Sequence, residues 1–422
     1  MTGTTTRAPD APRFVDYEKF LDCVHCGLCL SACPTYVELG TEMDSPRGRI
    51  YLMKGLEDGT LGLTPDVVRH LDLCLGCRAC ETACPSGVRY GELIESARSF
   101  VEEHHQRPLW QRVQRRLITL LFPRPRLLRL ALLPLRLLEL LGVLDELRRV
   151  NGLAAMLPRL SWWKPLPPIT AARGAEQHRV GFVSGCIAQV LFADTNRATV
   201  RVLTRNGCSV TTPADQGCCG ALYLHGGERQ AALACARHNL DAFGEHLDVI
   251  IVNAAGCGAM LKQYGELLAN DPVYAARAHA FSAKVRDVTE FLVALPLAPP
   301  RGAVRARVTY HDACHLVHGQ GVRDAPRHLL RQIPGVELVE LTEADMCCGS
   351  AGSYNLTEPE MARRLAERKV ANIRAANADW VVAANPGCVM QIQGALQRAG
   401  CRMGVCHPVE LLDAAYSGSV LK

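Results

Sequence analysis

The sequence of 422 residues has no apolar run that approaches the roughly 20 residues needed to span a bilayer. The nearest candidate, residues 116–150, is rich in leucine, but arginines and prolines interrupt it every few residues. Two interpretations stay open for this stretch. It forms short amphipathic helices that pack on the protein or on a partner, or it forms a basic amphipathic surface that lies on an anionic membrane.

Other absences narrow the function. The net charge of +5 is too small to indicate a nucleic-acid-binding protein. The opening residues, MTGTTTRAPDAPRF, are polar and lack the apolar segment of a secretory signal, so we expect a cytoplasmic protein without a disulfide framework. No G-x-G-x-x-G fingerprint follows a predicted strand, which indicates that flavin or nicotinamide chemistry belongs to a partner chain.

What the sequence does contain is cysteine: 20 residues, gathered in clusters as metal ligands are. Residues 23–34 (CVHCGLCLSACP) and 74–85 (CLGCRACETACP) both fit C-x2-C-x2-C-x3-C-P. In bacterial ferredoxins this spacing holds two [4Fe–4S] clusters, and the fourth cysteine of each run binds the other cluster. A zinc site is disfavoured, because zinc ribbons use paired C-x2-C knuckles. The predicted ligand sets are Cys23, Cys26, Cys29 and Cys84 for one cluster, and Cys74, Cys77, Cys80 and Cys33 for the other.

The residues between and around these runs predict a mostly helical domain over 14–105. A helix start at Ser45 and Pro46 precedes apolar positions in SPRGRIYLMKGLEDG, and TPDVVRHLDLCLG leads into the second run as another helix. Arg47 and Arg49 lie near the first run. They either offset the negative charge of a cluster and its thiolates or sit in solvent. Electron transfer is the expected role, because neither cluster has an open site for substrate; no catalytic residue is predicted.

The second half of the chain repeats itself. HRVGFVSGC and ARVTYHDAC, the two CCG motifs, and DVIIVNAAGC and DWVVAANPGC recur at offsets of 128 to 131 residues, which indicates duplicated domains. We place them at 176–300 and 301–422, after a helical linker rich in Leu, Arg and Pro over 106–175. The repeated cysteines, tentative metal ligands, are Cys186, Cys218, Cys219 and Cys257 in the first copy and Cys314, Cys347, Cys348 and Cys388 in the second.

Within each copy, short β-branched runs alternate with helical stretches, which predicts an α/β fold with a parallel sheet. The whole chain is therefore expected to be an α+β multidomain protein: a helical di-cluster domain followed by two α/β domains. Sites in such sheets form beyond the carboxyl ends of the strands, so the repeated cysteines of each copy should converge there. The glycine of each CCG motif is expected to let the backbone approach a bulky centre.

Seven further residues have an uncertain role. The cysteines without a counterpart in the other copy are interpreted as ordinary buried residues; they are Cys208, Cys235, Cys401 and Cys406. His311, Asp312 and His315 surround Cys314, whereas the first copy has no histidine at these places. They mark a ligand-binding or proton-handling second copy, or they are a polar strand end, and we favour the polar strand end.

The twin ferredoxin-type run followed by two CCG domains resembles the family of the iron-sulfur subunit of glycolate oxidase (glycolate dehydrogenase). The stretches MDSPRGRIYLMKGLEDG, CETACPSGVRYGELIE and MCCGSAGSYNLTEPEMA carry the resemblance. It implies a non-flavin subunit that accepts electrons from flavin-containing dehydrogenase subunits, which oxidise glycolate to glyoxylate, and passes them towards the quinone pool or another acceptor. A peripheral position on the cytoplasmic face of the inner membrane is compatible with this role.

Related families keep alternatives open: the iron-sulfur subunit of a lactate or glycerol-3-phosphate dehydrogenase, or an enzyme similar to heterodisulfide reductase. CCG domains of the heterodisulfide reductase type end in C-x2-C, but here Ala254 and Asn385 occupy the first position of that motif. This departure argues against a noncubane cluster and disulfide reduction. Each copy still has four thiols, enough for a further iron-sulfur cluster or zinc, or it binds nothing; a zinc-stapled scaffold without redox function is the third hypothesis.

Overall fold

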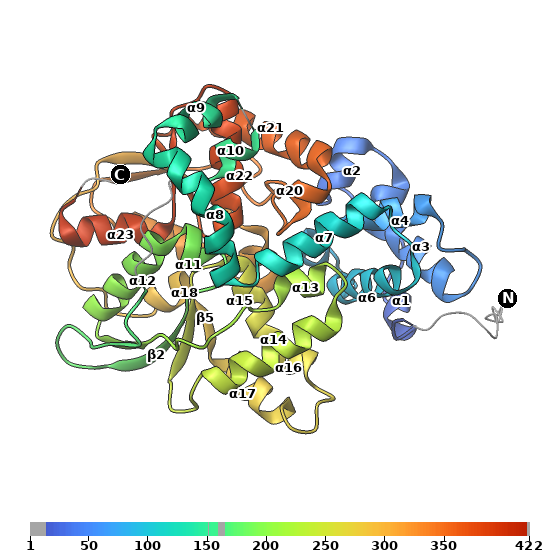
Figure 1. Cartoon of the computed structure of the whole chain (residues 1–422), viewed down its shortest axis with the longest axis horizontal. Helices are drawn as coiled ribbons and strands as arrows, with labels where there is room; N and C mark the ends of the chain where they lie inside the picture. The colour runs from blue at the N-terminus through green and yellow to red at the C-terminus, as the bar shows by residue number, and fades with distance from the viewer. Residues whose placement is uncertain (1–13, 151, 159–164, 420–422) are drawn as a thin grey trace.

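The computed structural model describes residues 14–150, 152–158 and 165–419. In Figure 1 the N-terminal domain lies at one end of the molecule and the two α/β domains at the other, with the linker helices α7 and α8 across the face between them. The α+β multidomain prediction is confirmed.

The N-terminal domain is helical, as predicted. Its two expected helices begin at Ser45 and Thr64, whose side-chain hydroxyls accept hydrogen bonds from the backbone N–H groups of Gly48 and Val67 and so cap the first turns. Leu71, Leu93 and other apolar side chains from these helices form its core. The elements are α1 (Glu18–Leu21), α2 (Pro34–Leu39), η1 (Glu42–Asp44), α3 (Pro46–Glu57), α4 (Pro65–Asp72), α5 (Ala79–Thr82) and α6 (Tyr90–His104).

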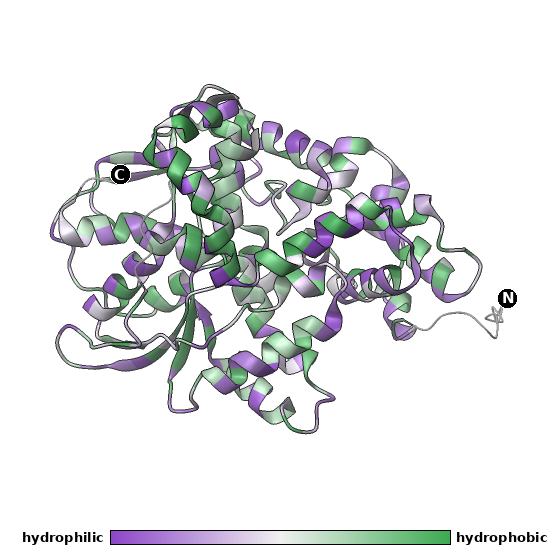
Figure 2. Cartoon of the chain, viewed as in Figure 1, coloured by the Kyte–Doolittle hydropathy of each residue, from purple (hydrophilic) through white to green (hydrophobic). Residues whose placement is uncertain are grey.

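The linker forms amphipathic helices, and no helix of the described residues is long and apolar enough to cross a membrane. Figure 2 shows hydrophilic and hydrophobic residues alternating along α7 and α8. Pro134 lies inside α8 without ending it. Proline has no backbone N–H, so the carbonyl oxygen of Leu130, four residues earlier, loses its helical hydrogen bond. Leu130 is exposed, and water can bind this oxygen instead. The helices are α7 (Leu109–Leu121), α8 (Pro125–Leu140), α9 (Val143–Val150) and α10 (Gly152–Met156).

The first α/β domain has a five-stranded sheet in the order β1-β3-β2-β4-β5, parallel except for β1. Its strands are β1 (Ile169–Thr170), β2 (His178–Val183), β3 (Cys208–Thr211), β4 (Val249–Val252) and β5 (Val285–Asp287). Its helices are α11 (Ala188–Leu191), α12 (Ala193–Arg205), α13 (Ala221–His225), α14 (Arg229–Ala242), α15 (Ala255–Lys262), α16 (Tyr264–Leu267), α17 (Ala275–Lys284) and α18 (Val288–Leu292).

The second α/β domain repeats this arrangement with an all-parallel sheet in the order β7-β6-β8-β9. Its strands are β6 (Ala306–His311), β7 (Val336–Val339), β8 (Trp380–Ala383) and β9 (Gly404–Cys406). Its helices are η2 (His315–Gly319, a π-helix), α19 (Asp324–Arg331), α20 (Tyr354–Thr357), α21 (Pro359–Ala376), α22 (Pro386–Arg398) and α23 (Pro408–Ser417). The predicted parallel sheets are confirmed.

The glycines of the two CCG motifs are required by the local backbone. Gly220 and Gly349 have φ of 92° and 86°, a conformation that favours glycine. A Cβ on Gly349 would lie 2.7 Å from the carbonyl oxygen of Ala362 in α21, and one on Gly220 would lie 3.2 Å from that of Ala232 in α14. These glycines therefore let the cysteine loop turn and pack against a helix of its own domain.

The two α/β domains share one hydrophobic core. Phe182 and Val180 of β2 belong to the same buried cluster as Tyr310 of β6 and Leu411 of α23. Helix α23 of the second copy packs on α12 of the first, and α18 packs on α19. Neither sheet can therefore unfold without exposing the core of the other.

We expect Phe182→Ala to lower the free energy of unfolding by about 3–5 kcal/mol, because it empties a fully buried site in the shared core. Anaerobic urea unfolding followed by circular dichroism should show one transition for both α/β domains, shifted to lower urea. Ile169→Ala, at a position 70% exposed, should shift it by no more than about 0.5 kcal/mol. Separate transitions for the two domains would contradict the shared core.

Candidate metal centres

The first cysteine pocket lies between the loop before α2 and the end of the second cysteine run. Cys23, Cys26, Cys29 and Cys84 all line it. Arg47 lines it too, and its guanidinium donates hydrogen bonds to Glu42 Oε1 (2.7 Å) and to the backbone oxygen of His25 (3.0 Å). Three thiols from the first run and two from the second, Cys84 and Cys80, therefore face the same space.

The second cysteine pocket has the reciprocal composition: Cys33, Cys74, Cys77 and Cys80 line it. Cys33 is the residue before α2, where Pro34 opens the helix and turns the chain across the domain. The pocket is more enclosed by protein than the first, since all four of its cysteines are buried. The structure thus brings the eight cysteines to two neighbouring pockets, and Cys80 lines both of them.

Arg49 is the charged residue of the second pocket. Its side chain is 1% exposed and lies 4.0 Å from Cys33 Sγ. It donates hydrogen bonds to the backbone oxygens of Asp44 (2.6 Å) and His70 (2.6 Å) and to Thr35 Oγ1 (3.0 Å). Of the two interpretations for Arg49, the structure supports charge compensation, because a buried cation needs opposite charge nearby.

The thiols of the second pocket differ in acidity. Burial opposes the charged form, and it raises the pKa of Cys77 and Cys80 well above the usual value. Burial also acts on Cys74, but the positive charges of Arg49 and Arg98 outweigh it and lower the pKa of that thiol. A soft metal centre binds thiolates and would displace the remaining protons. The donor set therefore fits an iron-sulfur cluster held by four thiolates.

The repeated cysteines of both α/β domains line a single cavity of about 620 Å³, which we call the interdomain cavity. Helices α8, α9 and α10 cover it with Leu128, Leu135, Leu144, Met156 and neighbouring apolar side chains. The sequence predicted convergence within each copy. It did not predict that the two sets face each other, because this depends on how the domains pack.

In the first copy, Cys186 Sγ and Cys218 Sγ are 3.5 Å apart. The Cys218 thiol and burial together raise the pKa of Cys186. Cys235, which the sequence predicts to be an ordinary buried residue, packs against the hydrophobic core of the first copy. Its side chain is half-buried, and the Cys218 thiol is the main cause that raises its pKa, so it lies beside the repeated cysteines. Its position on α14, which faces the loop after β3, escapes detection because it has no repeated counterpart.

In the second copy, His311 joins the cysteines. It is fully buried at the end of β6, and one of its ring nitrogens lies within 4.8 Å of both Cys348 Sγ and Cys388 Sγ, which are equally close to each other. Neither ring nitrogen has a hydrogen-bond partner among the described residues. Burial, with the positive charge of Lys369, lowers the pKa of His311 well below its usual value, which leaves the neutral form that binds metals.

The other two polar residues of this strand end have different surroundings. Asp312 is buried and accepts two hydrogen bonds of 2.7 Å from the Arg327 guanidinium, so it is a structural ion pair. His315 Nδ1 lies 3.4 Å from Cys314 Sγ and the residue lines the interdomain cavity. Asp312 is therefore a polar strand-end residue, whereas His311 lies beside two cysteines and His315 beside a third, so both interpretations stay open for the two histidines.

The second cysteine pocket and the interdomain cavity are neighbours. Leu75 lines both. Cys77 packs in one cluster with Cys314 and Cys347; besides burial, Cys314 helps to raise the pKa of Cys77, and Cys77 helps to raise that of Cys347. The N-terminal domain thus presents one of its cysteine pockets directly to the second copy.

The remaining cysteines lie elsewhere. Cys208 in β3 and Cys406 in β9 are buried core residues, as expected, whereas Cys401 is half-buried and follows α22. At the positions where a C-x2-C motif would begin, Ala254 is buried and Asn385 Nδ2 donates to Cys388 Sγ at 3.5 Å. An amide therefore contacts the thiol where another thiol would stand.

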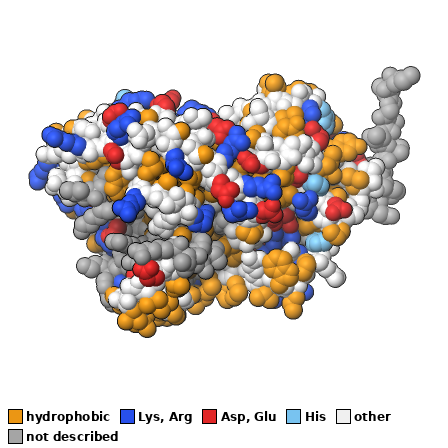
Figure 3. All heavy atoms as spheres, turned by 90° about the horizontal axis from the view of Figure 1, so that it is seen from above, with side chains coloured by type: hydrophobic (Ala, Val, Ile, Leu, Met, Phe, Trp, Pro, Cys, Tyr) orange, Lys and Arg blue, Asp and Glu red, His pale blue; other side chains and the backbone are white. Residues whose placement is uncertain are grey.

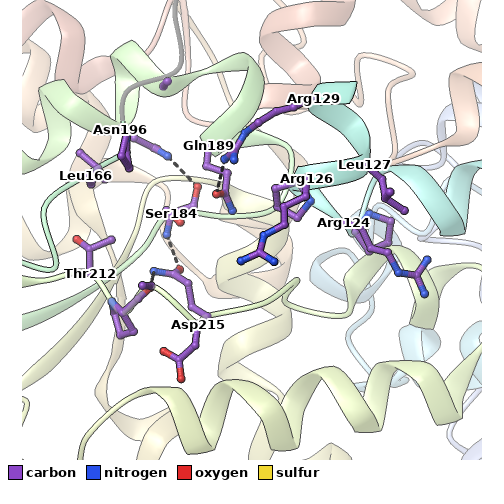
Figure 4. Close-up of a pocket in the computed structure, with 17 residues that line it drawn as sticks. Arg124, Arg126, Leu127, Arg129, Leu166, Ser184, Gln189, Asn196, Thr212 and Asp215 are labelled. Carbon is purple, nitrogen blue, oxygen red and sulfur yellow. Dashed lines mark hydrogen bonds between the residues drawn. The ribbon is translucent and has the colours of Figure 1, made fainter. Parts of the chain in front are cut away.

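A separate cavity of about 670 Å³ lies beyond the carboxyl ends of β2 and β3. Figure 4 shows Arg124, Arg126 and Arg129 at one side of it and Asp215 across from them. Arg129 Nη2 donates to Gln189 Oε1 at 3.0 Å. No cysteine lines this cavity, so it is distinct from the candidate metal centres.

Comparisons with known proteins agree with this division of the chain. Residues 19–88 match the "4Fe-4S dicluster domain" family, and residues 180–262 and 308–393 match the "Cysteine-rich domain" family named CCG. A solved structure of a hypothetical protein from Helicobacter pylori superposes with a TM-score of 0.56 over 97% of this chain and 78% of that one. Its identity of 9% supports the fold alone.

Two curated relatives cover nearly the whole sequence. The chain is 40% identical to the probable glycolate oxidase iron-sulfur subunit of Bacillus subtilis (strain 168), over 94% of each chain. It is 39% identical to the glycolate oxidase iron-sulfur subunit of Escherichia coli (strain K12), over 93% of each. The protein carries [4Fe–4S] clusters in its dicluster domain. The chain belongs to the family of glycolate oxidase iron-sulfur subunits.

Proposed function

We propose that this chain is the electron-transfer subunit of a flavin-dependent dehydrogenase complex that oxidises glycolate to glyoxylate. Flavin-containing subunits carry out the oxidation, and this chain passes the electrons towards quinone. The observation that supports the proposal is the succession of sites: two cysteine pockets in one domain, the second adjoining the interdomain cavity through Leu75. The names of the two relatives supply the substrate.

The roles of the residues follow from their positions. We assign Cys23, Cys26, Cys29 and Cys84 to one [4Fe–4S] cluster, and Cys33, Cys74, Cys77 and Cys80 to the other. Such clusters supply one-electron steps when bound. Arg49 lowers the electrostatic cost of negative charge in the second pocket, and the half-exposed first pocket is the side open to an electron donor.

The repeated cysteines are proposed as ligands of a further iron-sulfur cluster or zinc: Cys186, Cys218, Cys219 and Cys257 in the first copy, and Cys314, Cys347, Cys348 and Cys388 in the second. In the second copy we add His311 as a candidate ligand. A mixed set of thiolates and imidazole suits either centre.

We also propose that the outer face of α7 and α8 lies on the membrane. Residues 105–141 contain eight arginines and a single acidic residue, Glu139. Figure 3 shows hydrophobic side chains gathered along its lower edge. That edge is the face turned towards the viewer in Figure 1, where α7 and α8 lie. The exposed apolar residues of the two helices are Leu109, Trp110, Val113, Leu117, Leu120, Leu130, Leu133, Leu137 and Leu140. A basic, leucine-rich surface fits an anionic lipid headgroup layer.

The complex itself provides the first test. Co-expression with the flavin subunits should give a complex in which glycolate reduces the iron-sulfur clusters, seen as the EPR signal of the reduced centres under anaerobic conditions. Reduction by lactate or glycerol 3-phosphate, without reduction by glycolate, would favour the alternative dehydrogenases. A purified chain that contains zinc and no iron would refute an electron-transfer role.

We expect Cys80→Ser to lose about four irons per chain and the EPR signal of one cluster, because one thiolate of the second pocket is gone. Electron flow from glycolate to an acceptor should fall by at least about tenfold, since the path through Leu75 to the interdomain cavity begins there. Cys208→Ser is the matched control: this cysteine is buried in β3 outside every cysteine pocket. Equal iron content in the two variants would refute the assignment.

For membrane association, the double substitution Leu117→Glu and Leu137→Glu should reduce co-flotation with phosphatidylglycerol-rich vesicles by about tenfold or more. Each leucine that enters the lipid layer contributes up to about 1.5–3 kcal/mol. Val273→Glu, at an even more exposed apolar residue outside α7 and α8, should float like the unaltered chain. If the double leucine variant and Val273→Glu lose vesicle binding equally, or if neither loses it, this surface is not the membrane contact.

A further inference from the structure

The interdomain cavity combines an apolar wall with a supply of electrons. Leu128, Leu135 and Leu144 cover it from the linker helices. The outward face of the same α8 carries the exposed leucines described above. One helix therefore separates the cavity from the surface that we assign to the membrane. A ligand that reaches this cavity from the bilayer would be lipophilic and would find apolar contacts on entry.

Two imidazoles interrupt this apolar lining. His315 and His225 both line the cavity, and their ring centroids are 5.2 Å apart. The Nε2 atom of His315 is buried and has no hydrogen-bond partner among residues 14–150, 152–158 and 165–419. A buried ring nitrogen without a partner is costly, and a ligand carbonyl oxygen would satisfy it.

His225 has a carboxylate behind it. Its Nδ1 lies 3.2 Å from Oε1 of Glu95, a buried residue of α6 in the N-terminal domain. Burial alone would raise the pKa of Glu95, but the hydrogen bond and charge of His225 outweigh it and lower that pKa. The Glu95 carboxylate therefore faces the imidazole of His225 as a hydrogen-bond partner. The side chain of His225 is 26% exposed, so solvent can return a proton to it.

We propose that the interdomain cavity binds the ring of a lipophilic quinone, and that His225, held by Glu95, supplies the protons for its reduction. This inference rests on the proposed electron-transfer function and gives that function its acceptor site. Electrons cross from the second cysteine pocket past Leu75, which separates the two spaces. Among acceptors, a quinone fits best because it is apolar, carries two carbonyl oxygens and takes up protons together with electrons.

The reaction balances without another reagent. A quinone gains two electrons, which arrive singly through the clusters from the flavin subunit, and two protons, and becomes a quinol. His225 gives up one proton at a time to a quinone oxygen and is reprotonated from solvent between the steps. Glu95 does not touch the quinone; it is a positioning residue that orients the His225 ring through the 3.2 Å contact with Nδ1.

The cavity is tested by filling it. The purified, cluster-loaded chain is reduced by dithionite, freed of excess reductant and mixed with decyl-ubiquinone or ferricyanide in a stopped-flow instrument. Leu135→Trp replaces a leucine side chain in the cavity wall with a bulky indole ring. It should raise the half-saturating decyl-ubiquinone concentration by at least about tenfold and leave the ferricyanide rate unchanged. Val273→Trp, an exposed position outside the cavity, should leave both rates unchanged. Unaltered quinone kinetics in Leu135→Trp would overturn the site.

Proton supply is tested in the same assay. Glu95→Gln should lower the limiting rate of quinol formation by at least about tenfold, because a general acid contributes on this scale. The half-saturating quinone concentration, the iron content and the ferricyanide rate should not change, since ferricyanide takes up no proton. Glu92→Gln removes a carboxylate from the same helix that pairs with Lys19 instead and should have no effect. An equal fall of the quinone and ferricyanide rates in Glu95→Gln would mean a structural role and would overturn proton delivery.

The two proposals fail in different ways. If the chain contains no reducible cluster, neither acceptor is reduced and the electron-transfer function itself is wrong. If ferricyanide is reduced but decyl-ubiquinone is not, the function stands and the quinone site is wrong. If the CCG cysteines instead serve a disulfide substrate, the reduced chain should reduce a small disulfide and Leu135→Trp should leave decyl-ubiquinone kinetics unaltered.

Discussion

The N-terminal domain depends on the contact between the buried Arg49 guanidinium and the thiols around it. A cation that is 1% exposed would be costly without opposite charge; the buried Asp44 carboxylate lies 3.5 Å from the guanidinium, and the Cys33 sulfur lies 4.0 Å from it. The same guanidinium is hydrogen-bonded to the backbone of Asp44 and His70, which joins η1, α3 and α4. The same interaction therefore compensates charge and packs the helices together. It also holds Cys33, a residue of the first run, in the pocket of the second run.

Duplication gives the rest of the molecule its geometry. Each copy directs its cysteines beyond the carboxyl ends of a parallel sheet, and the shared core around Phe182 and Tyr310 holds the two sheets together so that both sets face the interdomain cavity. The last helix of each copy also begins in the same way, with a capping box. Asp287 and Glu290 form it at α18 in the first copy, and His407 and Glu410 form it at α23 in the second. The copies differ at the site itself, where only the second has His311.

Much of the site could be predicted from the chain. The exchange of the fourth cysteine between the two runs is predicted by C-x2-C-x2-C-x3-C-P spacing, and in the structure Cys84 lines the pocket of the first run and Cys33 that of the second. The residues that were missed lack a periodic or repeated signal. Cys235 lies beside Cys218 on a helix whose counterpart in the other copy has no cysteine. The cysteines near His311 are distant from it in sequence, so the sequence favours a strand-end role for this residue.

The sequence by itself determined the ligand types, the helical first domain and the two parallel sheets, because spacing and periodicity act over a few residues and depend little on distant packing. Only the tertiary structure decided that Arg49 is buried, that Leu75 lies between the second pocket and the cavity, and that both CCG sets share one space. The contacts around Arg49 join residues up to 21 positions apart, and the last two features depend on residues more than a hundred positions apart. The relative placement of domains, which no local pattern specifies, sets those contacts.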